Sequence, residues 1–259
     1  MKFKDFDLAR TLECGQCFNF TKLGEQEYEV RAFGRILHVC QRGEELDFGS
    51  ASGSDISDIW IPYFDLERDY GEINRALIKA DPRFEEIISA NYGIRILNQE
   101  FFETLISFII SQNNNIPRIR KIVAAISECG TFPSLEELSK MSEQDFRALG
   151  AGFRAPYIIN GIDYLKTCDE KALRAMTFSE AKAELMKIKG VGDKVANCAL
   201  LFSLGFRDAF PVDVWIKRIM EHMYFGCETD KGVIEAFARE KFGAFGGYAQ
   251  QYLFMHAKK

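Results

Sequence analysis

The stretch IKGVGDK at residues 188–194 decides the fold of this chain. Strong helix formers fill residues 180–186 before it, and apolar residues recur at helical spacing in 195–204 after it, which predicts a helix, a tight turn and a second helix. The turn glycines, Gly190 and Gly192, are expected to take backbone angles that other residues avoid. The free N–H groups that open the second helix then point outward, where a phosphate oxygen fits. A plain helix–helix connection is the alternative, because glycine pairs are common at such junctions.

An aspartate follows the hairpin at a spacing that allows it to act together with Lys194. Asp213 lies 19 residues after Lys194 and directly precedes a helical run. Aspartate is a preferred N-cap, so capping alone explains it. However, a helix of about ten residues followed by a turn would also bring the carboxylate back beside the amine. A lysine amine is nucleophilic only when neutral, and a nearby carboxylate can accept a proton or stabilise positive charge on a sugar, so the pair suits cleavage at a sugar carbon.

The hairpin, Lys194 and the PVD triplet at 211–213 resemble the helix-hairpin-helix DNA glycosylase superfamily, specifically its 8-oxoguanine DNA glycosylase/AP lyase branch. Four more segments resemble that branch in the same order, namely CGQCF at 14–18, SQNNNI at 111–116, GAGFRA at 150–155 and GYAQQYLF at 247–254. The resemblance implies a bifunctional N-glycosylase and lyase of base excision repair. The implied mechanism begins when damaged guanine is flipped out of the duplex. Lys194 then attacks the sugar C1′ to give a Schiff base, and β-elimination nicks the strand. Asp213 is implied as the second catalytic residue.

The resemblance also implies a pocket for the flipped base. Gln250 offers both a donor and an acceptor for the Watson–Crick edge of a purine, and Phe254 follows four residues later on the same helical face. Cys198 is implied on the opposite face of the ring, and the carbonyl of Gly15 is implied to accept the N7 hydrogen that only the oxidised base carries. Without the resemblance, Phe254 and Cys198 are better interpreted as core residues.

A second group is implied to contact the DNA around the lesion. Asn113, Arg118 and Arg154 match the positions that recognise the orphaned cytosine, Phe153 is expected to wedge into the stack, and the hairpin glycines are expected to bind DNA. Without the resemblance, the asparagines would be a helix stop and the arginines solvated charges. Two positions depart from the family pattern: Trp215 replaces a histidine that contacts a phosphate, and Lys189 replaces the usual proline of the hairpin.

The composition of the chain limits which binding partners and which cellular compartment are expected. The net charge of −5 argues mildly against a nucleic-acid partner, but basic residues are expected to gather on the DNA face, at Arg118, Arg120, Lys121, Lys182, Lys187, Lys189, Lys194, Lys217 and Arg218. Seven cysteines, no signal sequence and no long apolar run indicate a reducing, bacterial-type cytoplasm without a membrane partner. We expect a monomer that binds double-stranded DNA containing oxidised guanine. No cofactor is expected to be required, and no metal site is predicted with certainty. A monovalent or divalent cation on the backbone carbonyls of Met186, Ile188 and Val191 is left open.

The order of patterns predicts an α+β, mostly α chain. Alternation and turns between 27 and 48 predict short antiparallel strands, and helical patterns follow at 70–80, 83–90, 99–111, 116–128, 134–140, 143–149 and 155–167. The prediction is an N-terminal α/β domain with an antiparallel sheet, residues 1–92, packed on a helical glycosylase domain, residues 93–259. The helical domain is expected to hold two subdomains and the helix-hairpin-helix motif, with its hairpin at 186–194.

Two other functions compete with the 8-oxoguanine hypothesis. A glycosylase for alkylated bases shares the fold and the aspartate but typically lacks the lysine, so Lys194 argues against it. A non-catalytic DNA-binding module would use the hairpin for a phosphate alone, and it would leave Lys194 and Asp213 without a joint purpose.

Overall fold

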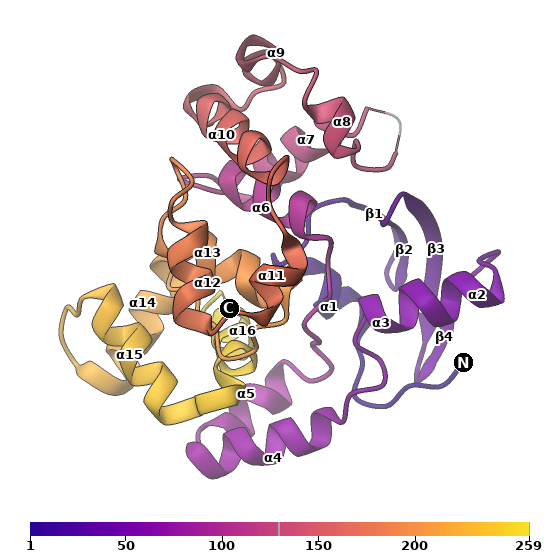
Figure 1. Cartoon of the computed structure of the whole chain (residues 1–259). Coiled ribbons are helices and arrows are strands. Elements are labelled where there is room, and N and C mark those ends of the chain that lie inside the picture. Colours follow the sequence, from indigo (N-terminus) through magenta and orange to yellow (C-terminus); the bar gives the residue numbers. More distant parts are fainter. Residues whose placement is uncertain (129, 259) are drawn as a thin grey trace.

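Residues 20–47 form a four-stranded antiparallel sheet in the computed structural model, which describes residues 1–128 and 130–258 (Figure 1). The strands lie in the order β1 (Phe20–Gly24), β2 (Glu27–Ala32), β3 (Arg35–Arg42) and β4 (Glu45–Asp47). Tyr28 pairs with Val39, and Val30 pairs with Leu37; all four side chains are buried. The strands predicted between 27 and 48 are therefore confirmed. β1 escapes prediction because only its first residue is buried, which leaves no alternating pattern.

Short helices cover the buried face of this sheet. They are α1 (Leu8–Glu13), α2 (Gly53–Asp55) and α3 (Ile61–Tyr63), with a π-helical turn at Ile56–Trp60. Leu8 and Leu12 of α1 join Trp60 and Phe64 in one apolar cluster with the inner face of the sheet. Burying these side chains supplies the N-terminal core.

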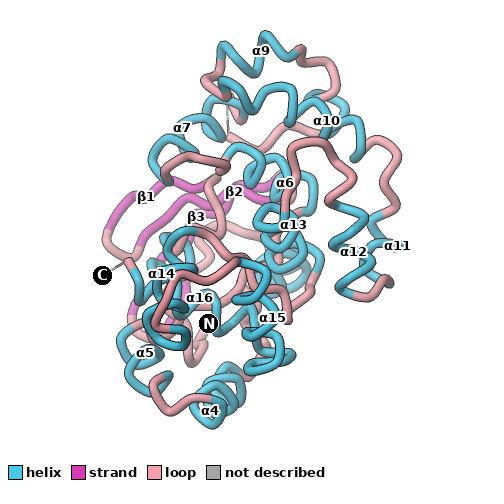
Figure 2. Tube along the Cα trace, turned by 90° about the vertical axis from the view of Figure 1, so that its left-hand side faces the viewer, coloured by secondary structure: helices cyan, strands magenta, loops and turns pink. Residues whose placement is uncertain are grey.

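The rest of the chain is helical, which confirms the predicted fold class. The helices are α4 (Tyr70–Ala80), α5 (Phe84–Ala90), α6 (Phe101–Ile110), α7 (Ile116–Ile126), α8 (Leu135–Leu138), α9 (Glu143–Ala148), α10 (Ala155–Leu165), α11 (Glu170–Ala175), α12 (Phe178–Leu185), α13 (Asp193–Ala199), α14 (Val214–Met220), α15 (Lys231–Phe242) and α16 (Gly246–Ala257). Figure 2 shows α6 and α13 packed side by side. Every helix predicted between 70 and 167 forms, although α8 is shorter than predicted. Within the described residues, none of the helices is long and apolar enough to cross a bilayer.

A second, larger apolar cluster holds the helices together. It includes side chains of α4 and α5, such as Ile73 and Ile87, together with those of α6, α13 and α16. Helices α4 and α5 precede residue 93, yet they pack in the helical core. The division of the chain after residue 92 stays a prediction.

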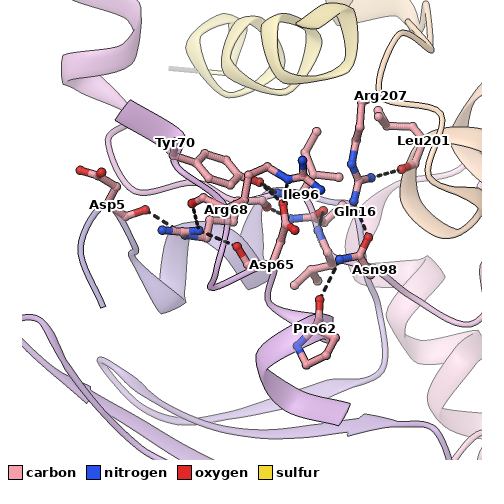
Figure 3. Close-up of polar contacts among 12 residues, drawn as sticks. Asp5, Gln16, Pro62, Asp65, Arg68, Tyr70, Ile96, Asn98, Leu201 and Arg207 are labelled. Atoms are coloured by element: carbon pink, nitrogen blue, oxygen red, sulfur yellow. Dashed lines mark hydrogen bonds and ion pairs between the residues drawn. The ribbon is translucent and has the colours of Figure 1, made fainter. Parts of the chain in front are cut away.

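The buried side chain of Gln16 joins the N-terminal loop to the segment that leads into α6 (Figure 3). Its Nε2 donates to the backbone carbonyl of Arg95 at 2.7 Å, and its Oε1 accepts from the backbone N–H of Leu97 at 2.9 Å. Because these bonds are shielded from water, they hold the loop in one conformation. The neighbouring Gly15 is fixed with it.

Asn98 extends this junction in two directions. Its Nδ2 donates to the carbonyl of Pro62 in α3 at 2.7 Å, and its Oδ1 accepts a hydrogen bond from Arg207, which lies on the chain between α13 and α14 (Figure 3). The sheet region, α6 and the loop after the hairpin helix are therefore tied together directly.

Candidate active site

One cleft of about 1160 Å³ gathers residues from both ends of the chain and from the hairpin. Seven of the residues singled out from the sequence line it: Gly15, Asn113, Phe153, Gly192, Lys194, Asp213 and Phe254. Five others, Arg118, Arg154, Gly190, Cys198 and Gln250, lie outside its lining. The cleft is large enough for a nucleotide-sized ligand.

Lys194 lies in the first turn of α13 and projects into the cleft. Its Nζ donates to Ser111 Oγ at 2.8 Å and lies 4.7 Å from the centre of the Phe108 ring. Ser111 in turn donates its own proton to the carbonyl of Phe108 at 2.7 Å, so the hydroxyl accepts from the amine. The sequence singled out the segment around Ser111 but not this residue. It fixes the direction of the amine.

Asp213 is the N-cap of α14, as predicted: its Oδ1 accepts from the backbone N–H of Ile216 at 2.8 Å. The carboxylate lines the same cleft as Lys194, but among the described residues no ion pair joins the two groups. Within the described part of the chain, the other carboxylate oxygen of Asp213 has no hydrogen-bond donor, so it is available to a ligand. The amine and the carboxylate thus share one cavity without neutralising each other directly.

Cys198 lies close enough to Lys194 and Asp213 for both to influence its thiol. Burial raises the pKa of its thiol to about 11, with Lys194 lowering it and Asp213 raising it to a smaller extent. At neutral pH the thiol is therefore protonated and behaves as a small apolar group. It does not compete with the lysine as a nucleophile.

Gly15 and Phe254 form one wall of the cleft. Gly15 has a φ of +81°, and a Cβ there would lie 3.1 Å from Cδ1 of Ile116 and 3.4 Å from Cε1 of Phe254. Glycine is thus favoured both by its left-handed conformation and by the close approach of its neighbours. The described residues form no hydrogen bond to the Gly15 carbonyl. The phenyl ring therefore lies against the Gly15 loop, whose carbonyl has no protein donor among the described residues.

Gln250 is buried behind this wall in α16, with 5% of its surface exposed. Its Oε1 lacks a hydrogen-bond partner within the described part of the chain. An unpaired buried amide oxygen costs about 1–3 kcal/mol, and a donor group on a ligand would remove that cost. The next residue, Gln251, donates to the carbonyl of Cys14 at 3.2 Å and holds α16 against the loop of Gly15.

The group predicted to face the opposite strand splits into exposed and buried members. Asn113, Arg118 and Phe153 are exposed, Phe153 by 51%. Arg154 is only 2% exposed: its guanidinium donates to the carbonyls of Gln112 and Asn113 at 2.7 Å each and stacks 4.3 Å from the Phe153 ring. In this structure Arg154 therefore shapes the loop that carries Asn113 and Phe153.

The two hairpin glycines differ, which corrects the prediction for one of them. Gly190 has a φ of +95°, and a Cβ there would lie 2.2 Å from the ring of Tyr157. Gly192 has a φ of −103°, an extended backbone open to any residue, and nothing lies within 4 Å of its Cβ position. Packing and conformation explain Gly190. Neither explains Gly192, which faces the open cleft.

The hairpin carbonyls proposed for a cation are partly engaged. The Ile188 carbonyl accepts from the backbone N–H of Val191 at 2.9 Å. Within residues 1–128 and 130–258, no group of three or more His, Cys, Asp or Glu side chains is arranged to hold a metal ion. The described residues include six cysteines, and all are free thiols.

Some of the basic residues predicted for the DNA face are already bonded to other parts of the protein. Lys182, Lys187 and Lys217 are engaged in ion pairs with carboxylates, and Arg120 donates to the carbonyl of Phe20 at 2.8 Å. Sequence alone cannot distinguish a paired lysine from a free one. Trp215, in contrast, is 42% exposed and lines the cleft beside Asp213.

Comparisons with known proteins cover almost the whole chain. Residues 1–105 match the 8-oxoguanine DNA glycosylase N-terminal domain, and residues 106–243 match the HhH-GPD superfamily of base excision DNA repair proteins. The chain is 33% identical to the N-glycosylase/DNA lyase OGG1 of Arabidopsis thaliana over 97% of this chain and 77% of that protein.

Solved structures agree with these matches. The 8-oxoguanine glycosylase/lyase of Clostridium acetobutylicum, in complex with double-stranded DNA containing cytosine opposite 8-oxoguanine, is 36% identical with a TM-score of 0.94 and covers 100% of this chain and 99% of its own. MBOgg1 in complex with a low-affinity DNA ligand is 41% identical with a TM-score of 0.94, over 98% of this chain and 92% of its own. The 3-methyladenine DNA-glycosylase of Archaeoglobus fulgidus, at 20% identity and a TM-score of 0.79, shares the fold.

Proposed function

The chain belongs to the 8-oxoguanine glycosylase branch of the HhH-GPD base excision repair family, and on that premise we propose that it excises 8-oxoguanine opposite cytosine and nicks the resulting strand. The observation that carries this proposal is the placement of the Lys194 amine and the Asp213 carboxylate in one cleft. An amine aimed by Ser111 and an unpaired carboxylate suit attack at an anomeric carbon.

The reaction follows from these groups. Lys194 gives up a proton and its amine forms a bond to C1′ as the bond from C1′ to the base breaks; the base leaves with the electron pair and takes up a proton from the solvent. Asp213 stabilises the positive charge that develops on the sugar. The nitrogen bonded to C1′ then loses a proton, and the C1′–O4′ bond breaks as the C1′=N Schiff base forms, with O4′ taking up a proton. Removal of a C2′ proton then expels the 3′ phosphate by β-elimination.

Recognition of the base is proposed for the pocket around Gln250. Flipping costs a few kcal/mol, so the pocket must return that energy through stacking and edge hydrogen bonds. Phe254 and the protonated Cys198 supply the two faces of a ring, and the unpartnered Oε1 of Gln250 can accept from a Watson–Crick edge. The free carbonyl of Gly15 can accept the N7 hydrogen that distinguishes 8-oxoguanine from guanine.

The opposite strand is proposed to meet the exposed trio of Asn113, Arg118 and Phe153, with Phe153 filling the space left by the flipped base. Arg154 is proposed to reach the orphaned cytosine only as part of this loop, since its guanidinium is bonded to backbone carbonyls. We further propose that the enzyme acts as a monomer on double-stranded DNA in the cytoplasm. A cation on the carbonyls of Met186, Ile188 and Val191 is proposed to bind only when a DNA phosphate shares it.

The test uses the full chain and a duplex with 8-oxoguanine opposite cytosine. We expect release of the base, followed by cleavage of the strand at the resulting site. When borohydride is added to reduce the Schiff base, we expect a covalent complex between the protein and the DNA. A duplex with 3-methyladenine should stay intact. Binding without excision would favour the non-catalytic module, and cleavage of the alkylated base alone would favour the other glycosylase class.

Gln250→Ala is expected to weaken recognition of the flipped base more than general affinity for a duplex. Without the amide, the edge of the lesion loses its partner, so kcat/KM for the lesion should fall by about 10–100-fold. Affinity for an undamaged duplex, measured by fluorescence anisotropy, serves as the internal control and should change less than twofold. Equal losses in both measurements would contradict a role in reading the base.

Alanine at the two hairpin glycines is expected to separate folding from DNA binding. Gly190→Ala should destabilise the fold by about 3 kcal/mol or more, because the methyl group meets Tyr157 and the backbone is left-handed. Gly192→Ala should cost about 1 kcal/mol or less, from the N-cap position alone. Its duplex affinity should nevertheless fall about tenfold, because the methyl group occupies the place of a phosphate. Thermal melting and anisotropy measure the two effects; normal binding by Gly192→Ala would refute the phosphate site.

A further inference from the structure

Lys182 lies on the helix that enters the hairpin, but its amine is directed back to residues that follow the hairpin. Its Nζ lies 2.9 Å from Asp193 Oδ1 and 2.8 Å from each carboxylate oxygen of Glu235. The side chain of Lys182 is 15% exposed and that of Glu235 is 10% exposed. Arg239 approaches Glu235 at 3.4 Å. This cluster therefore joins α12, α13 and α15 by charge-assisted hydrogen bonds.

The two carboxylates stand at the edge of the cleft. Asp193 is the residue directly after Gly192 and opens α13, and both it and Glu235 line the cavity. Asp193 is 67% exposed on its side chain, so its charge faces the space next to the hairpin. The hydrogen bond from Lys182 is the main cause that holds the pKa of Asp193 below its usual range, so the group is ionised at neutral pH.

An ionised aspartate is an unfavourable neighbour for a phosphate. The N–H groups after Gly192 attract an anion, whereas an uncompensated carboxylate on the same turn repels it. Lys182 places a positive charge against that carboxylate from the protein side, and it leaves the side facing the cleft open. The hairpin can then bind an anion in spite of its own acidic residue.

We propose that Lys182 is a positioning residue for DNA: it cancels the charge of Asp193 and fixes the hairpin to α15, so that a backbone phosphate can approach Gly192. The inference rests on the proposed function, because it needs a DNA phosphate at the hairpin. It assigns to Lys182 an electrostatic role through Asp193 and no contact with the DNA.

The test compares substitutions with opposite expected signs. Affinity is measured by anisotropy at low salt on a lesion duplex whose damaged nucleotide carries a 2′-fluorine, which slows sugar cleavage. Lys182→Met should bind about tenfold more weakly than the wild type, Asp193→Asn should bind more tightly, and Lys182→Met with Asp193→Asn should return to near wild-type affinity. The difference between the wild type and Lys182→Met should shrink as salt is raised.

Controls separate this role from a structural one. Lys187→Met removes the same charge from a lysine that pairs with Glu184 outside the cleft, and it should weaken binding less than threefold. Lys182→Arg keeps the positive charge, so its affinity for the duplex should be close to that of the wild type. Thermal melting identifies any variant that is unfolded at the assay temperature, and Lys182→Gln provides a second neutral variant.

Three outcomes decide the inference. Rescue of Lys182→Met by Asp193→Asn supports it, because a purely structural bridge is not repaired by removing its exposed partner. Binding by Lys182→Met within twofold of the wild type overturns it, and so does a failure of rescue. If the wild type neither binds nor excises the lesion, the proposed function fails instead, which the first measurement of the series shows.

Discussion

Lys194→Gln is expected to abolish covalent trapping on an 8-oxoguanine duplex and to reduce excision by roughly 10⁴-fold or more, the scale seen when a nucleophile is removed. Glutamine is one bond shorter than lysine and also ends in a polar group, so the substitution should leave the fold of the cleft intact. Its amide nitrogen has no available lone pair for attack at C1′. Trapping with borohydride followed by gel electrophoresis measures the covalent complex, and single-turnover kinetics measure the loss of the base.

A second amine in the cleft provides the control for this experiment. Lys258 lines the cavity, and its Nζ lies 4.8 Å from the centre of the Phe254 ring. Lys258→Gln should still trap, since the Ser111 hydroxyl aims Lys194 and not Lys258. Persistent trapping by Lys194→Gln together with its loss in Lys258→Gln would transfer the nucleophile to the other lysine.

Asp213→Asn is expected to slow excision by about 10²–10³-fold, because a neutral amide cannot stabilise positive charge on the sugar. The fold should be little affected, since asparagine is as good an N-cap as aspartate and its side-chain oxygen can still accept from the N–H of Ile216. Affinity for the lesion duplex should also stay within about threefold. The substitution thus separates the chemical step from binding.

Asp213→Ala is the matched variant, because it removes both the charge and the cap. It should lose a further ~1 kcal/mol of stability relative to Asp213→Asn, with excision reduced to the same degree. Thermal melting and single-turnover excision distinguish the two contributions. Near-normal excision by Asp213→Asn would show that capping is the whole purpose of this residue.

Local patterns account for what the sequence predicts well. The hairpin helices, the cap at Asp213 and the helices between 70 and 167 depend on neighbours within a few residues, and their apolar periodicity is visible in the sequence. The cleft that unites Lys194 with Asp213 follows less directly. That the two residues lie together could be predicted only from the resemblance to a family, because turn geometry alone does not determine the distance between them.

Contacts between distant segments account for what the sequence does not predict. Ser111 and Lys194 are 83 residues apart, and no spacing rule links them. Lys182 resembles a DNA-facing lysine in the sequence, and only the fold brings Glu235 to its amine. Gly192 shows the converse: its conformation is ordinary, so the reason for a glycine there is not found within the free protein.

The bond between Gln251 and the carbonyl of Cys14 joins two residues that are 237 positions apart in the sequence. The wall made by Gly15 and Phe254 therefore cannot form on a nascent chain until α16 has left the ribosome. Closing so long a loop is slow compared with forming the hairpin, whose contacts are local. A chain synthesised only as far as the hairpin therefore lacks the wall of the cleft that Gly15 and Phe254 form together.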